Sequence, residues 1–274
     1  MIHRRWMTRE EDRGDMTTDF EALIDRFRDR RVLVLGDMVA DEYVIGRPSR
    51  ISREAPVLIL HFAESFVRPG GATNTAYNLR ALGAHATVVG AIGNDEMGAR
   101  LRQALDDVGV RTTGLIVDES RPTSTATRVL AKGMQEVQQQ IVRIDRITRS
   151  PVEGETRERM IEAVRVGVRE VDALLISDYE NGVISQDLLD ICLPEARRHG
   201  CRIIVDAHGD LFRFRDITAA TPNQPEAEAT LKRVIESDED LHAAGVELVH
   251  GMQAEGVLIT RGSQEWVCGK WTRC

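Results

Sequence analysis

Short apolar runs that alternate with amphipathic stretches constrain the fold of this chain more than any other feature. The strand-like runs, rich in Val, Ile and Leu, lie at 31–37, 86–93, 172–178, 201–207, 217–223 and 256–262. The helix-like stretches lie at 18–29, 95–110, 153–170, 185–199, 224–235 and 238–252. Strands that alternate with helices predict an α/β fold, in which a mostly parallel central sheet has helices on both faces.

One further helix is expected within "RPGGATNTAYNLRALGA", residues 68–84. Gly70 and Gly71 precede it, and Gly83 ends it. Paired glycines allow a ligand or another backbone to approach closely. The pair is equally consistent with a tight turn.

Two stretches, 43–66 and 113–145, break the alternation because they look β-like and have no helix between their strands. Period-2 alternation and turn residues predict strands there. These strands either form a small sheet that acts as a lid over a ligand, or are edge strands of the main sheet. The pattern gives the two alternatives equal weight.

Composition narrows the class of partner. The formal net charge is -8, which argues against nucleic acid and membrane surfaces as partners, since both attract basic patches. The 4 cysteines include no CxxC pair, which favours free thiols in a reducing compartment and predicts a cytoplasmic protein. No apolar run is long enough to span a membrane.

The expected organisation has three parts. Residues 1–17 are charged and non-periodic, which predicts a loose tail, and Met16 is an alternative start. Residues 18–262 form the domain. Residues 263–274, "SQEWVCGKWTRC", contain Trp and Cys residues and are unlike the rest of the chain in composition.

Polar residues gather where the predicted strands end. In open parallel sheets, ligands bind beyond the carboxyl ends of the strands. The candidate residues there are Asp37, Asp41, Gly70, Gly71, Asn74, Asp178, Asp206, His208, Asn223, Glu226, Thr260, Arg261 and Gly262. Taken singly, each has a structural explanation: an Asp after a strand is often a helix cap, and Asn223 with Glu226 fits a capping box. The chain contains no GxxxxGK[ST], GxGxxG, HExxH or GxSxG motif.

Four phrases resemble the ribokinase-like (PfkB) carbohydrate kinases: "VLGDMVADEYVIGRPSRISREAPV", "RPGGATNTAYNLRALGA", "SDYENGV" and "TPNQPEAE". Within that family the chain is most similar to bacterial kinases of D-glycero-β-D-manno-heptose 7-phosphate. The resemblance implies a ribokinase-like fold with a small β-sheet lid. It implies ATP-dependent phosphoryl transfer to the anomeric hydroxyl of the sugar, on the route to ADP-heptose for lipopolysaccharide.

The resemblance also assigns an acceptor side. Asp37, helped by Asp41, would accept hydrogen bonds from sugar hydroxyls. Gly70 and Gly71 would let backbone amides reach the sugar, and Asn74 would bond another hydroxyl. Separately, Arg53 resembles a basic lid residue that meets the substrate's phosphate, although a plain surface arginine is equally consistent. The lid is a candidate homodimer interface.

On the nucleotide side, the resemblance places Asn223 and Glu226 near Mg²⁺ and the ATP phosphates, with Glu226 acting on the metal through water. Thr260 and Gly262 would lie beside those phosphates. Asp206 and His208 stand where heptose kinases read Asp-Pro-Lys-Gly. The fixed charge of that lysine is thus replaced by an imidazole that is largely neutral at pH 7, which puts anion binding there in question.

A larger departure follows Gly262. The family places a GAGD motif there, whose aspartate is the base and whose amides stabilise the moving phosphoryl group. Residues 263–274 contain no aspartate and no glycine pair. The sequence therefore leaves a truncated or frameshifted reading frame as a hypothesis. It also leaves two alternatives to a heptose kinase: a non-catalytic protein that binds sugar phosphate or dimerises, and another sugar or nucleoside kinase of this fold.

Overall fold

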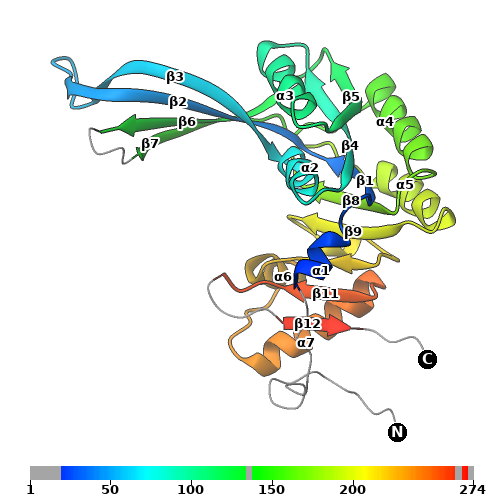
Figure 1. Ribbon diagram of the computed structural model, residues 1–274. Coiled ribbons are helices and arrows are strands. Elements are labelled where there is room, and N and C mark those ends of the chain that lie inside the picture. The colour runs from blue at the N-terminus through cyan, green and yellow to red at the C-terminus, as the bar shows by residue number, and fades with distance from the viewer. Residues whose placement is uncertain (1–19, 134–137, 263–266, 271–274) are drawn as a thin grey trace, which may run out of the picture.

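The computed structural model of the protein describes residues 20–133, 138–262 and 267–270. Its larger sheet has the order β12-β11-β10-β9-β8-β1-β4-β5 (Figure 1). These strands are β1 (Arg31–Gly36), β4 (His85–Gly93), β5 (Arg111–Asp118), β8 (Ala173–Asp178), β9 (Arg202–Ala207), β10 (Ala219–Ala220), β11 (Gly256–Ile259) and β12 (Val267–Lys270). Neighbouring strands are parallel except for the β11–β12 pair, so the predicted α/β fold is confirmed.

Helices cover the two faces of this sheet. They are α1 (Phe20–Asp25), α2 (Ala72–Ala81), α3 (Glu96–Asp106), α4 (Gly154–Gly167), α5 (Gln186–Arg198), α6 (Gln224–Leu231) and α7 (Asp238–Met252), with a 3-10 turn η1 (Leu211–Arg213). Side chains of β1 alternate between two buried clusters. Leu33 and Leu35 join the cluster that contains α4, α5 and α7, whereas Val32 and Val34 join the one that contains α2 and α3. None of the helices within the described ranges is long and apolar enough to cross a membrane.

Local signals set most helix starts. Asp95 caps α3 by accepting a hydrogen bond from the Gly98 amide, and Ser185 and Ser237 cap α5 and α7 in the same way. Several elements are shorter than predicted, and two of them differ most. The helix expected at 18–29 is described only over Phe20–Asp25, and the strand expected at 217–223 is reduced to Ala219–Ala220.

A second sheet of four strands stands off the body (Figure 1). Its order is β3-β2-β6-β7, from β2 (Met38–Ile51), β3 (Leu58–Gly71), β6 (Ser124–Lys132) and β7 (Gln138–Arg146). The prediction of a separate small sheet is therefore confirmed for 43–66. For 113–145 it is wrong in part, because residues 113–118 belong to β5, which pairs with β4 at the edge of the larger sheet. The expected tail, residues 1–17, lies outside the described residues.

The first passage of the chain from the larger sheet to the second sheet takes a single residue. Asp37 lies between the end of β1 and the start of β2, and the Ala72 amide at the start of α2 donates to its carbonyl oxygen at 3.0 Å. Just before it, Gly36 touches β8 so closely that a Cβ there would lie 2.1 Å from the Ser177 carbonyl oxygen. The packing of β1 on β8 thus fixes where the second sheet and α2 begin.

Gly36→Ala should lower the free energy of unfolding by about 2 kcal/mol or more, because the new methyl group has to push β1 from β8. Gly133→Ala is the matched control, since a Cβ there would meet nothing within 4 Å. Urea unfolding of both variants checks this. Equal losses of stability in the two variants would contradict the account.

Candidate functional site

Polar side chains from successive strands meet at one edge of the larger sheet. Parallel strands end on the same side, so Asp37 after β1, Asp178 at the end of β8 and the 206–208 segment of β9 lie together. The His208 amide donates to the Asp178 carbonyl oxygen at 2.9 Å, which ties two of these ends directly. This edge is the candidate site.

Asp37 lies at its base and is only 1% exposed. One carboxylate oxygen, Oδ2, accepts hydrogen bonds from the amides of Tyr179 at 2.6 Å and Asn181 at 3.2 Å. The other oxygen, Oδ1, is buried and has no hydrogen-bond partner. Burial raises the pKa of Asp37, and the amides of Tyr179, Asn181 and Val183, followed by the charge of Arg121, oppose that rise. A buried acceptor without a partner is costly, so this oxygen is poised for a hydroxyl donor from a ligand.

Asp178 is a second buried carboxylate, 2% exposed, that the sequence placed at a strand end without giving it a role. Its Oδ1 accepts from the Glu180 amide at 2.9 Å, and its Oδ2 accepts from Arg213 Nη1 at 3.3 Å. Burial, and then the nearby charge of Asp37, raise its pKa to about 6 despite Arg213. The two carboxylates therefore share one electrostatic environment.

The glycine pair lies where predicted, against the aspartates. Gly71 has φ 54°, and a Cβ on it would lie 2.7 Å from the Asp37 carbonyl oxygen. A Cβ on Gly70 would lie 2.8 Å from Asp41 Oδ2. Asn74 is exposed in the first turn of α2, the helix that follows Gly71 directly. The structure thus brings Asp37, Asp41, Gly70 and Gly71 together, and it places Asn74 in the helix that follows them.

A cluster continues this side where the second sheet, which is expected to act as a lid, leaves the body. Of its members, sequence reasoning identified only Asp41. The lid-base cluster consists of Asp41, Tyr43, Phe66, Arg68 and Arg128, which the strand register places on one face. Arg128 Nη2 donates to Asp41 Oδ1 at 3.1 Å, and its buried Nε has no partner. The rings of Tyr43 and Phe66 stack with centroids 5.1 Å apart, and Arg68 lies over both.

Arg53 is not brought to this edge. It is exposed in the turn between β2 and β3, whose strands pair from Met38–Gly71 at the base to Ile51–Leu58 at the far end. Strands of this length span roughly 40 Å at about 3.3 Å per residue. Figure 1 shows the β2–β3 hairpin reaching away from the body. Within one chain the expected contact between Arg53 and the acceptor side is therefore wrong.

Asn223 and Glu226, which are expected on the nucleotide side, form the capping box that begins α6. Asn223 Oδ1 accepts from the Glu226 amide at 2.9 Å, and Glu226 Oε2 accepts from the Asn223 amide at 2.8 Å. The remaining oxygen of Glu226, Oε1, lies 2.9 Å from His208 Nδ1. Burial raises the pKa of nearby Asp206, while His208 and a hydrogen bond from Thr221 lower it. Four of the expected residues are thus brought together here.

Thr260 joins this group through the backbone. Its amide donates to the Pro222 carbonyl oxygen and its carbonyl oxygen accepts from the Gln224 amide, both at 2.9 Å. Gly262, with φ 60°, ends the segment, and Arg261 pairs with Asp238 at the start of α7 at 3.0 Å. Of the unusual C-terminal stretch, residues 263–266 and 271–274 lie outside the described residues, and Val267–Lys270 pair with β11.

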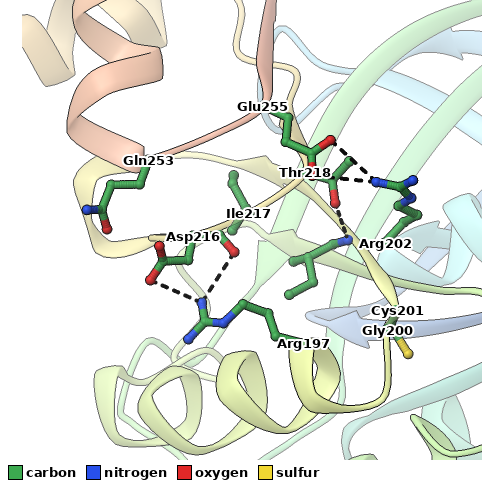
Figure 2. A pocket seen from close by; sticks show the side chains of 10 residues that line it. Arg197, Gly200, Cys201, Arg202, Asp216, Ile217, Thr218, Gln253 and Glu255 are labelled. Carbon is green, nitrogen blue, oxygen red and sulfur yellow. Dashed lines mark hydrogen bonds and ion pairs between the residues drawn. The ribbon is translucent and has the colours of Figure 1, made fainter. Parts of the chain in front are cut away.

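One hollow lies away from this site. A cavity of about 720 Å³ opens at the amino ends of β9, β10 and β11, opposite the candidate site (Figure 2). Its two arginines are already paired, Arg197 with Asp216 at 3.4 Å and Arg202 with Glu255 at 3.4 Å. The cavity therefore offers no unpaired charge for a ligand, and the acceptor-side polar groups remain the stronger candidate.

The raised pKa of Asp178 has a consequence for stability. Between pH 3.8 and about 6 the folded protein holds this proton more tightly than the unfolded chain, so this group's contribution to stability is lost as the pH rises through that window. In the wild type this contribution to the free energy of unfolding falls by up to about 3 kcal/mol as the pH rises through the window, and Asp178→Asn should remove that fall. Urea unfolding from about pH 4 to pH 7, with exposed Asp190→Asn as control, checks this. Curves for Asp178→Asn and the wild type that run parallel would refute it.

Comparison with known proteins identifies the family of this chain. The model of the pfkB family carbohydrate kinases matches residues 29–270. Over 247 residues the chain is 38% identical to "Bifunctional protein HldE" of Geotalea uraniireducens, covering 90% of this chain and 49% of that protein. The protein of the same name from Helicobacter hepaticus is 35% identical over 84% of this chain and 47% of its own length. The chain thus spans about half the length of these relatives.

Solved structures agree on the fold. Phosphofructokinase-2 from Escherichia coli, crystallised with substrates and products, superposes with a TM-score of 0.67 at 22% identity, over 90% of this chain and 77% of that one. The chain has an α/β body, a small second sheet that stands off the body, and polar residues at the carboxyl ends of the parallel strands. Together with the family match, this shows that the chain belongs to the pfkB family of carbohydrate kinases.

Proposed function

We propose that this protein is an ATP-dependent sugar kinase that transfers a phosphoryl group to the anomeric hydroxyl of heptose 7-phosphate, in the cytoplasm, for ADP-heptose and lipopolysaccharide precursor synthesis. The observation that carries the acceptor site is Asp37 Oδ1, a buried oxygen without a partner beside Gly70 and Gly71. The relatives named bifunctional protein HldE, together with the heptose-kinase phrases, favour a heptose phosphate over other sugars.

In this proposal Asp37 orients the sugar. Its Oδ2 is fixed by two backbone amides, so its Oδ1 accepts a sugar hydroxyl without having to reorganise. Asp41 and Asn74 bond further hydroxyls, and the absence of a Cβ at Gly70 and Gly71 lets the sugar ring come close to the backbone. These residues bind and orient the acceptor.

The phosphate on the sugar is assigned to Arg68 and Arg128 in place of Arg53. Both guanidinium groups lie at the lid base near Asp41, and Arg128 Nε is unpaired. Planar guanidinium groups match phosphate oxygens in two-point contacts. A phosphorylated sugar is therefore favoured over a nucleoside.

Arg128→Met should weaken binding of heptose 7-phosphate about tenfold or more. Binding of the unphosphorylated heptose should weaken less, because that sugar has no phosphate contact to lose and loses only the support that Arg128 gives to Asp41. Arg143→Met, at an exposed lid arginine that pairs with Asp145, is the matched control. Isothermal titration with both sugars measures this. An equal loss for the two sugars would place Arg128 outside the phosphate contact.

ATP and Mg²⁺ are proposed for the opposite side of the site. ATP supplies the phosphoryl group, and Mg²⁺ neutralises charge on its phosphates. In the described part of the chain no three His, Cys, Asp or Glu side chains are grouped to hold a metal ion. Glu226 has one oxygen in its cap and one against His208, which fits a contact to nucleotide-bound Mg²⁺ through water. Asn223, Thr260, Gly262, Asp206 and His208 would surround the phosphates.

A second candidate is a protein that binds the sugar phosphate without turnover. It would use the same acceptor-side residues, Asp37, Gly70 and Gly71, and would differ from the kinase in transferring no phosphoryl group. Another sugar kinase of this fold is a further alternative. A coupled assay with ATP and heptose 7-phosphate separates them: turnover that Asp37→Asn lowers at least tenfold supports the kinase. Tight sugar-phosphate binding with no turnover supports the second candidate, and neither binding nor turnover overturns the heptose proposal.

The lid is proposed as the interface of a homodimer. Each described residue of β7 is exposed, among them Val142 and Ile144, and Phe62 on β3 is 70% exposed. A sheet face this apolar and this open to water is typical of a surface that a partner covers.

Ile144→Lys should shift the protein from dimer toward monomer, because a charge replaces an apolar side chain that is 57% exposed in the single chain. Val234→Lys, at an exposed valine outside the lid, should leave the mass unchanged. Sedimentation velocity measures both. A dimer that survives Ile144→Lys, or a wild-type monomer at high concentration, would argue against this interface.

A further inference from the structure

Arg121 is a buried cation that the proposed function leaves without a role. It follows β5, where the chain leaves the larger sheet for β6 of the lid, and it is only 8% exposed. Burying a guanidinium group is costly unless its donors are satisfied. Burial lowers the pKa of Arg121, and the charges of Asp118 and Asp37 oppose that shift.

Its hydrogen bonds join three segments that are far apart in sequence. Nη2 donates to the Thr148 carbonyl oxygen at 2.8 Å, where the chain returns from β7 toward α4. The same nitrogen donates to the Asn181 carbonyl oxygen at 2.8 Å, in the loop between β8 and α5. One side chain thus connects the crossing from β5 to β6, and the crossing that returns from β7 to α4, with this loop.

That loop is the one that holds Asp37. The amide of Asn181, whose carbonyl group Arg121 binds, donates to Asp37 Oδ2 at 3.2 Å. The segment that leads from β7 to α4 also bonds this loop, because the Val152 amide donates to the Gly182 carbonyl oxygen at 2.9 Å. A Cβ on Gly182 would lie 2.2 Å from the Ser150 carbonyl oxygen, so the two backbones are in direct contact.

We propose that Arg121 is a positioning residue that ties the segments at the base of the lid to the loop whose amides orient Asp37. The position of the lid base and the orientation of the Asp37 carboxylate are thereby fixed relative to each other. The proposal rests on the proposed function, in which Asp37 binds the sugar. Arg121 acts through Asn181 and touches neither sugar nor nucleotide.

The charge of Arg121 adds a second effect on Asp37. The titratable and charged groups around this carboxylate are Arg121, Asp178 and Tyr179, with Arg213 acting on Asp178 from η1. Arg121 lowers the pKa of Asp37 against burial. Its removal is therefore expected to raise that pKa further, and so to move the loss of sugar binding on acidification to a higher pH.

The test uses the full chain and three variants. Arg121→Met removes charge and hydrogen bonds, and Arg121→Lys keeps the charge but loses the two-carbonyl contact. Arg102→Met is the matched control, because Arg102 also donates to two backbone carbonyls, of Thr112 and Leu115, away from Asp37. Amide hydrogen exchange of Tyr179 and Asn181, and carbon NMR titration of the Asp37 carboxyl group, are measured without any sugar.

Arg121→Met should speed hydrogen exchange of the Asn181 amide about tenfold and raise the pKa of Asp37. Arg121→Lys should bring the pKa of Asp37 back toward its wild-type value, but should slow the exchange of the Asn181 amide less completely. Binding of heptose 7-phosphate should weaken about tenfold in Arg121→Met and less than about twofold in Arg102→Met. If Arg121→Met does not fold, the same exchange measurement on Arg121→Lys decides. Exchange and pKa unchanged in a folded variant would overturn the proposal. If the exchange rate and the pKa both change, but the wild type binds no sugar, the positioning role of Arg121 is supported and the proposed function is rejected.

Discussion

The contact between β1 and β8 is the constraint on which the rest of the site depends. Gly36 packs against the Ser177 carbonyl group, and one residue later the Asp37 carboxylate accepts the amides of the loop that follows β8. The chain then enters the lid directly from Asp37, and α2 begins from a hydrogen bond to its carbonyl oxygen. Sheet packing, lid and glycine-led helix therefore all take their position from the same few atoms.

Buried charge is the second organising feature. Asp37 and Asp178 lie in one poorly solvated region, which raises the pKa of both. Two arginines from different parts of the chain donate to the loop between β8 and α5. Arg121, which follows β5, donates to the Asn181 carbonyl oxygen, and Arg213, in η1, donates to the Ile184 carbonyl oxygen. Carboxylates held this way do not need to reorganise when a hydroxyl donor arrives, which is the arrangement that favours tight orientation of an acceptor.

Much of this could be predicted from sequence because the signals are local. The apolar runs ending in Asp37 and Asp178 and the Gly70–Gly71 pair reflect backbone rules that act over a few residues. Asn223 and Glu226 also show a limit of such reasoning: their spacing predicts a capping box equally well, and the structure confirms the box.

Other features depend on pairing over long distances. The resemblance suggests that Arg53 meets the substrate's phosphate, with a plain surface arginine equally consistent. The register of β2 and β3, which the sequence does not display, puts Arg53 at the far end of the hairpin. Residues 113–118 alternate like a lid strand, yet they pair with β4 in the body. Arg68 and Arg128 were missed because only the alignment of β2, β3 and β6 brings them beside Asp41 and Tyr43. Period-2 alternation around Tyr43 was a signal that could have pointed to this face.

The central claim is that Asp37 Oδ1 is the acceptor for a sugar hydroxyl. The most direct measurement is an isothermal titration of heptose 7-phosphate, without nucleotide, into the wild type and Asp37→Asn. The account predicts saturable binding to the wild type and at least about tenfold weaker binding to Asp37→Asn, since the carboxylate acceptor is lost while its shape is kept. Equal affinity of the two proteins for this sugar would contradict it.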